Sequence, residues 1–166
     1  MVIREIEVNE AEKLASLIQQ VEAESAYMLM EAGERRTTAE QHRKRIESMK
    51  TSENSTILVA ENSGTLVGYM FVIGGTVRRT KYSVYLVVGI LKDYRGQGIG
   101  TKLFERLDQW AVSHKIHRLE LTVVTRNEAG VGLYKKMGFE IEGTKKHSLL
   151  IAGEFVDEYY MAKLLQ

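Results

Sequence analysis

The segment from Asp93 to Leu103 constrains the fold of this chain most strongly, because it is a glycine-dense turn between two patterned stretches. Residues 82–91 before it are mostly apolar and β-branched, and apolar residues recur after it at helical spacing, at Leu103, Leu107, Trp110 and Ala111. This pattern predicts a strand, a glycine loop and a helix. The first N–H groups of a helix lack carbonyl partners and lie at its positive end, so we predict an anion site, with phosphate as the ligand.

The glycine spacing argues against two common phosphate ligands. The dinucleotide fingerprint requires glycine at its first, third and sixth positions, and counting from Gly96 the sixth is Thr101. The nucleoside triphosphate loop requires Gly-Lys followed by Ser or Thr, whereas here Gly100 is followed by Thr101 and then Lys102. Neither a nicotinamide enzyme nor an ATPase is expected.

Two motifs in the second half of the chain match a known family. The first is Arg/Gln-x-x-Gly-x-Gly/Ala, filled by Arg95, Gly98 and Gly100. The second runs from Asn127 to Phe139 and contains Asn, a small residue, Leu-Tyr and then Gly-Phe. On these motifs, the chain resembles the GCN5-related N-acetyltransferase (GNAT) family. The tail, 143–164, is similar to the ribosomal-protein and polyamine acetyltransferase branches.

This resemblance implies that acetyl-CoA is the co-substrate, with its diphosphate wrapped by backbone N–H groups of the glycine loop. The cofactor arm is expected to add as an extra strand beside the main chain of Ile90. The implied cofactor-binding residues are Ile90, Arg95, Gly96, Gln97, Gly98, Ile99, Gly100, Thr101 and Asn127. Asn127 is also predicted to cap the helix that follows it. An ordinary strand-to-helix turn is the alternative interpretation of the loop.

Tyr134 is the predicted catalytic residue. Attack of an amine on a thioester expels a thiolate, and a phenol with an ordinary pKa near ~10 is suited to protonate it. The Leu-Tyr-x-x-x-Gly-Phe context favours this role over that of a packed aromatic side chain. A general base is predicted at Glu120, acting through water, with Tyr85 as the alternative; an error of one residue in strand phase would turn either away from the site.

Composition limits the class of protein. At 166 residues the chain is expected to form one domain, 1–166, without disulfides, thiolate metal sites or a cysteine nucleophile, because it has no cysteine. A formal charge of +1 argues against nucleic acid as a partner. The charged N-terminus and the absence of a long apolar run predict a cytoplasmic protein without a membrane anchor. Histidines 42, 114, 117 and 147 lack metal-ligand spacing and are interpreted as helix-end or surface residues, so no metal is expected.

The hydrophobic pattern predicts an α/β (α+β mixed) fold. The expected strands are 2–8, 56–61, 65–73, 82–91, 117–124 and two within 143–164, and the expected helices are capped by Asn9, by Thr38 with Gln41, by the glycine loop and by Asn127. They give a central mixed, mostly antiparallel sheet with flanking helices. The strands 82–91 and 117–124 are expected to be parallel, and the resemblance implies that they splay apart. A bulge at Gly89 is expected to open the splay, and relief of packing is the alternative.

The resemblance implies an amine acceptor, and an amine-bearing small molecule, a polyamine and a protein N-terminus are the candidates. The acidic stretch of Glu22, Glu24, Glu31 and Glu34 is a candidate for holding a cation, and a solvated loop is the alternative. The strand at Tyr159–Met161 is a candidate edge for pairing in a homodimer. The predicted function is acetyl-CoA-dependent N-acetylation by direct attack in a ternary complex. The rivals are a non-catalytic acyl-CoA-binding regulatory domain and an interaction module unrelated to CoA.

Overall fold

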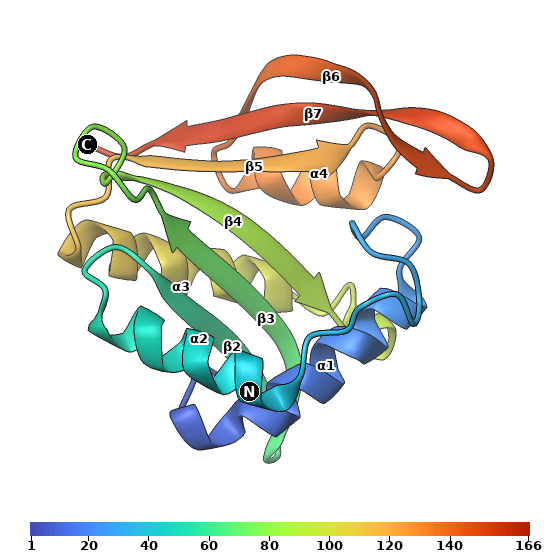
Figure 1. Ribbon diagram of the computed structural model, residues 1–166. Helices are drawn as coiled ribbons and strands as arrows, with labels where there is room; N and C mark the ends of the chain where they lie inside the picture. The colour runs from blue at the N-terminus through green and yellow to red at the C-terminus, as the bar shows by residue number, and fades with distance from the viewer.

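The computed structural model describes residues 1–166 and has its strands and helices in the predicted order (Figure 1). The strands are β1 (Val2–Glu5), β2 (Thr56–Asn62), β3 (Thr65–Gly74), β4 (Ser83–Ile90), β5 (Arg118–Val124), β6 (Glu140–Ile151) and β7 (Glu154–Leu164). The α-helices are α1 (Ala11–Glu24), α2 (Ala39–Thr51), α3 (Ile99–Ser113) and α4 (Glu128–Lys136). None of these helices combines the length and the apolar character that crossing a bilayer requires.

The strands form one seven-stranded sheet in the order β1-β2-β3-β4-β5-β7-β6. All neighbours are antiparallel except β4 and β5, which confirms the predicted mixed α/β fold. The parallel ladder ends at the pair Tyr85 and Glu120. Beyond that pair β4 and β5 diverge, as Figure 1 shows, and the predicted splay is confirmed.

The C-terminal hairpin places β7 inside the sheet. β7 pairs with β5 on one side, where Thr122 lies opposite Tyr160, and with β6 on the other. The prediction that the strand at Tyr159–Met161 is a free edge is therefore wrong, because the hairpin folds so that its first strand lies outermost. β6 is the exposed edge of the sheet at this end.

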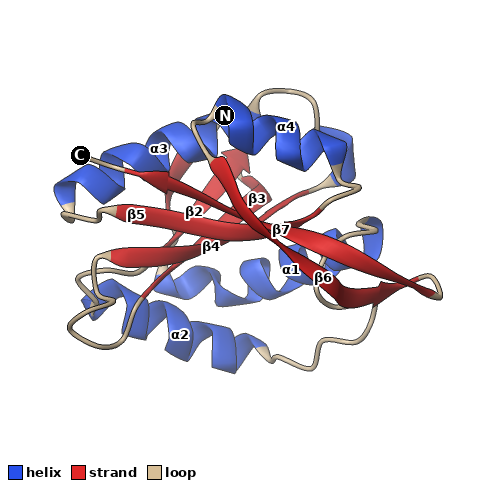
Figure 2. Cartoon of the chain, turned by 90° about the horizontal axis from the view of Figure 1, so that it is seen from above, coloured by secondary structure: helices blue, strands red, loops and turns tan.

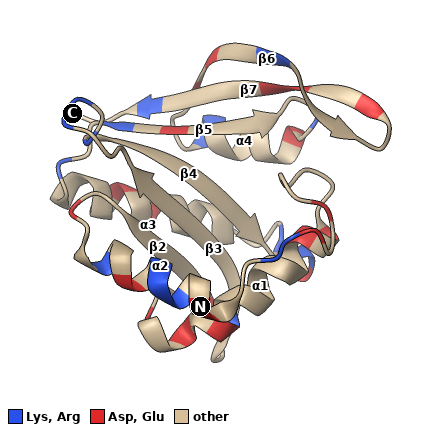
Figure 3. Ribbon diagram, in the orientation of Figure 1, with Lys and Arg blue, Asp and Glu red and all other residues tan.

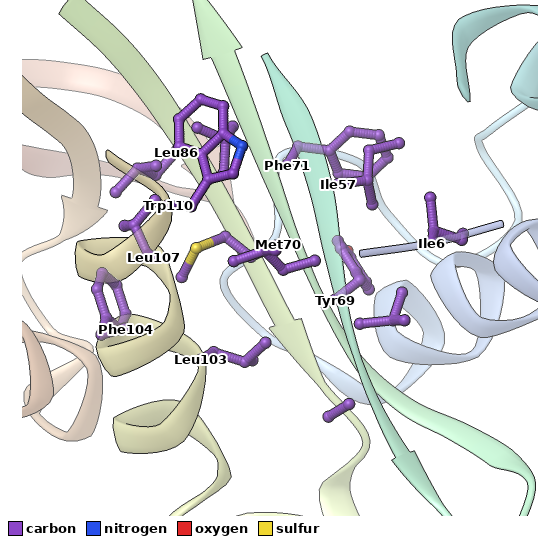
Figure 4. Close-up of a cluster of buried hydrophobic side chains, with 14 of the residues drawn as sticks. Ile6, Ile57, Tyr69, Met70, Phe71, Leu86, Leu103, Phe104, Leu107 and Trp110 are labelled. Atoms are coloured by element: carbon purple, nitrogen blue, oxygen red, sulfur yellow. The ribbon is translucent and has the colours of Figure 1, made fainter. Parts of the chain in front are cut away.

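Helices cover both faces of the sheet, with α3 and α4 on one face and α1 and α2 on the other (Figure 2). The packing of α3 on β3 and β4 uses five fully or almost fully buried side chains, Leu103, Leu107, Trp110, Met70 and Leu86 (Figure 4). Burial of each such side chain is worth about 1.5–3 kcal/mol. These contacts fix α3 against the sheet and so place the glycine loop, which begins α3, just beyond the end of β4.

The two N-terminal helices begin differently. For α2 the predicted cap is confirmed: the Gln41 N–H donates to the Thr38 hydroxyl (3.1 Å), and the Thr38 N–H donates to the Gln41 side chain (2.8 Å). For α1 the predicted cap at Asn9 is wrong. The chain enters α1 through a short 3₁₀ turn in which the Glu7 N–H donates to the Glu10 carboxylate (2.9 Å), and no side chain caps the first amides of α1.

Gly89 makes room for a neighbouring aromatic ring. β3 and β4 pair through Gly89 without a shift of register, so the expected bulge is absent. A Cβ atom on Gly89 would lie 2.6 Å from the ring of Tyr69, which is 1% exposed. The packing interpretation is therefore correct. The splay arises instead because β5 pairs with β4 over only three residues.

Gly89→Ala is expected to lower the free energy of unfolding by about 1–3 kcal/mol, because the added methyl group must displace the Tyr69 ring. The matched control is Gly132→Ala on α4, where a Cβ meets nothing within 4 Å. That change is expected to stabilise the protein by about 0.5–1 kcal/mol. Urea unfolding of both variants checks the prediction, and equal stability of the two would contradict it.

Candidate active site

β4 presents free backbone groups on the side that faces β5. The Leu91 N–H donates to the Val67 carbonyl (3.0 Å), on the β3 side. Hydrogen bonds alternate along an antiparallel ladder, so the amides of Val88 and Ile90 point to the opposite side, where β5 does not pair. An extended ligand arm can hydrogen-bond there, as the resemblance implies for Ile90. Val88 was not identified from the sequence, because the direction of its amide depends on strand register.

The glycine loop has the backbone shape of an anion site. Gly96 and Gly98 have φ values of 73° and 82°, and a Cβ on either would meet no protein atom within 4 Å. Gly98 is the N-cap of α3, whose first hydrogen bond runs from the Lys102 N–H to the Gly98 carbonyl (3.1 Å). The amides of Ile99, Gly100 and Thr101 therefore have no helical partner. These open glycines and unpaired amides fit a diphosphate.

The other predicted loop residues support the loop's shape in this structure. Arg95 donates through Nε to the Ile90 carbonyl (3.3 Å), and the Gln97 side chain donates to the Asp93 carbonyl (2.9 Å). A Cβ on Gly100 would lie 2.7 Å from Leu133, so this glycine lets α3 approach α4 closely. The structure thus shows a positioning role for these three residues, and their contacts with cofactor stay a prediction.

α4 closes the far side of the glycine loop. The Asn127 side chain accepts from the Gly130 N–H (3.0 Å), which confirms the predicted cap. A Cβ on Gly130 would lie 2.6 Å from the Asn127 amide, so Gly130 makes room for that cap. Lys136 donates to the Thr101 hydroxyl (3.2 Å) and brings a cation to the start of α3. A cation beside unpaired amides further favours an anionic ligand.

Tyr134 lies between α4 and the core, with its ring against Phe104 (centroids 5.6 Å apart) and Phe139 (6.2 Å apart). Burial raises the pKa of Tyr134 to about 12, and the nearby Tyr85 contributes to the same shift. The phenol therefore stays protonated near neutral pH and can donate a hydrogen bond. Tyr85, which contributes to this shift, is the last residue of β4 that pairs with β5.

Tyr85 and Glu120 share the opposite face of the sheet. They are direct neighbours in the parallel ladder, and the Tyr85 hydroxyl is 2.8 Å from the Thr122 hydroxyl. Both residues therefore point to the same face of the sheet, and their role in catalysis stays a prediction. The Glu120 carboxylate accepts from Arg118 Nε (2.8 Å), and Arg118 also pairs with Glu142. This ion pair was not predicted from the sequence.

The acidic stretch from Glu22 to Glu34, which begins in the last turn of α1, has carboxylates that are already engaged within the protein. Glu22 is 3% exposed and accepts from both Nε (3.0 Å) and Nη2 (2.7 Å) of Arg35. Glu24 accepts from the Lys92 N–H (3.0 Å), and Glu34 accepts from the Glu31 N–H (3.0 Å). The expectation that these carboxylates hold a polyamine is therefore not supported for Glu22 or Glu24, since each already has a partner within the protein.

His42 departs from its sequence interpretation as a helix-end or surface residue. It is 2% exposed on the inner side of α2, and neither ring nitrogen has a hydrogen-bond partner. Burial, followed by the charges of Arg35 and Arg45, lowers the pKa of His42. No group of three or more His, Cys, Asp or Glu side chains is arranged to hold a metal ion.

Residues 20–139 match the Acetyltransferase (GNAT) family. The chain belongs to this family. It is therefore an acetyltransferase, and its co-substrate is acetyl-CoA. The open edge of β4 and the glycine loop are the parts of this GNAT enzyme whose geometry fits that co-substrate.

Named relatives and solved structures agree with this assignment. The L-amino acid N-acetyltransferase AaaT of Escherichia coli is 37% identical over 113 residues, which cover 64% of this chain and 67% of that protein. A GNAT acetyltransferase from Streptococcus pneumoniae is 31% identical, with a TM-score of 0.95 and 99% of each chain covered. A ribosomal-protein-alanine N-acetyltransferase from Brucella melitensis is 27% identical, with a TM-score of 0.85 and coverage of 99% of this chain and 100% of that one.

Gly98→Ala is expected to weaken acetyl-CoA binding about 10-fold or more, because alanine disfavours this backbone conformation and its methyl group would stand between the loop and the diphosphate. Gly33→Ala is the matched control, since Gly33 also has a positive φ (76°) and an open surrounding. Calorimetric titration with acetyl-CoA checks the prediction. Equal affinity of the two variants would show that the loop does not hold the diphosphate.

Stability is expected to fall as the pH drops from about 7 to about 5.5, partly through His42. Folding lowers the pKa of His42, so the unfolded chain binds the proton more readily and is favoured below the ordinary histidine pKa. His42→Leu is expected to reduce this pH dependence. Urea unfolding at both pH values checks it, and an unchanged pH dependence in the variant would contradict the assignment.

Proposed function

We propose that this GNAT enzyme transfers the acetyl group directly to the α-amine of an amino acid or of a peptide N-terminus. The observation that carries the proposal is Tyr134, a half-buried phenol on α4 that is near Tyr85, the last residue of β4 to pair with β5. Direct attack in a ternary complex suits a chain that has no cysteine to form a thioester with the acyl group. Glycine-loop amides would hold the donor on one side of the gap between β4 and β5, and the face with Tyr85 would receive the acceptor.

In the proposed reaction, the amine nitrogen attacks the thioester carbonyl carbon while the Ile90 N–H donates to the carbonyl oxygen. The carbon–sulfur bond then breaks, sulfur takes the electron pair, and Tyr134 donates its proton to sulfur. A pKa of about 12 makes Tyr134 a weaker acid than an exposed phenol. Burial of the thiolate raises the pKa of its conjugate thiol as well, so the pKa values of the Tyr134 phenol and of this thiol differ less than the Tyr134 shift alone suggests.

The proton lost by the amine needs an exit. We place this exit on the face that Tyr85 shares with Glu120, where the Tyr85 and Thr122 hydroxyls are hydrogen-bonded. Arg118 engages only Oε2 of Glu120, which leaves Oε1 to accept a proton through water. An α-amine has a pKa of about 8, so it is partly neutral near pH 7 and needs only a weak base.

The α-amine is the acceptor that the relatives favour. The named substrates of the Escherichia coli and Brucella melitensis proteins, an L-amino acid and a ribosomal-protein alanine, are both α-amines or carry one. A polyamine is less well supported, because Glu22 and Glu24 already have partners within the protein. Small amines and polyamines belong in the same acceptor screen, so that the screen can contradict this choice.

Tyr134→Phe is expected to lower kcat by about 100-fold or more while leaving acetyl-CoA affinity unchanged, because it removes only the proton donor. Tyr82→Phe is the matched control, since Tyr82 is 48% exposed and lies before the other end of β4. Thiol release in a screen of amines measures kcat. An unchanged kcat in Tyr134→Phe would remove Tyr134 from this role, and saturable acetyl-CoA binding without transfer to any amine would support the non-catalytic rival.

A further inference from the structure

Arg45 on α2 is a cation without an acidic partner. Its guanidinium carbon lies 4.7 Å from the centre of the Phe71 ring, and no ion pair or hydrogen bond engages it. The neighbouring arginine differs, because Arg43 pairs with both Glu40 and Glu47. Stacking on Phe71 holds the Arg45 guanidinium in place while leaving its N–H donors unused.

The surroundings of Arg45 leave its charge uncompensated. Glu22, the nearest buried carboxylate on α1, is fully engaged by Arg35. His42 adds no negative charge, and the guanidinium groups of Arg35 and Arg45 lower its pKa and disfavour its protonation. β3 and β4 contain no charged residue, so the sheet beside α2 is tan along both strands in Figure 3. The cluster of Glu22, Arg35, His42 and Arg45 therefore carries a net positive charge.

Strand register places Arg45 near the proposed point of transfer. Phe71 lies opposite Val87, and Val87 lies between Tyr85 and Gly89 on the same face of β4. Neighbouring strands are about 5 Å apart, and alternate residues of a strand are about 7 Å apart. Arg45 thus stands one strand away from the stretch that ends at the Ile90 amide.

We propose that Arg45 binds the carboxylate of the acceptor and so selects a free α-amino acid over a peptide N-terminus. The inference rests on the proposed function and names the acceptor class of the same site. An α-amino acid carries its carboxylate beside the reacting amine, and a planar guanidinium fork matches that group with two parallel hydrogen bonds. A peptide N-terminus has an amide at the same position, which lacks the negative charge.

The test compares steady-state acetylation of L-amino acids with that of their carboxamides. Wild-type protein is expected to prefer the acids. Arg45→Gln is expected to lower kcat/KM for the acids about 10–100-fold, mainly through KM, with little change for the carboxamides. Arg45→Lys, which keeps the charge and loses the fork, is expected to recover part of the loss. Lys44→Gln removes a neighbouring exposed charge of α2 and is expected to behave as wild type.

Several outcomes would overturn the inference while leaving the proposed function intact. They are equal use of acids and carboxamides by wild-type protein, preference for short peptides, or equal losses on acids and carboxamides in Arg45→Gln. Failure of wild-type protein to release thiol with any amine would instead overturn the proposed function and this inference together. Acetyl-CoA titration of each variant shows whether it is folded and binds the donor. Arg45 lies on the face of the sheet opposite α3, so a folded variant is expected to bind acetyl-CoA as the wild type does.

Discussion

β5 leaves β4 after three residue pairs, and the chemistry of the molecule depends on that separation. If the parallel ladder continued, the amides of Val88 and Ile90 would be used within the sheet and no main-chain group would remain for the donor. The separation is stable because each strand is held elsewhere. β5 pairs with β7 along its whole length, and β4 pairs with β3 from Val84 to Ile90. The gap is therefore a property of the pairing pattern and does not require a strained residue.

The two faces of the sheet carry different chemical groups near this gap. α3 and α4 supply free amides, the Lys136 cation and the Tyr134 phenol, all of which suit an anionic donor and its leaving group. The face of α1 and α2 carries Tyr85 and the stacked Arg45, which suit a small polar acceptor. The Glu120 carboxylate on this face is held in an ion pair with Arg118.

Local pattern was enough to predict the order of elements, the caps at Thr38 and Asn127, and the glycine loop, because each depends on residues within one turn of chain. The predictions that were wrong concerned residues whose environment depends on contacts with residues distant in sequence. The ring of Tyr69 requires a glycine at position 89, and the fold of the C-terminal hairpin decides which strand is the edge of the sheet. Burial under α2 distinguishes His42 from an exposed histidine. The Glu22–Arg35 pair likewise joins residues that only the path of the loop brings together.

The groups that fit the donor are main-chain N–H groups, which every residue except proline possesses. The side chains of exposed loop residues can therefore change during evolution without removing these N–H groups, as long as the loop keeps its shape. The proposed acceptor contact differs, because it depends on one side chain, that of Arg45, and a single substitution there would remove it. A scaffold arranged in this way can diversify its choice of amine while its use of a common metabolic thioester stays constant.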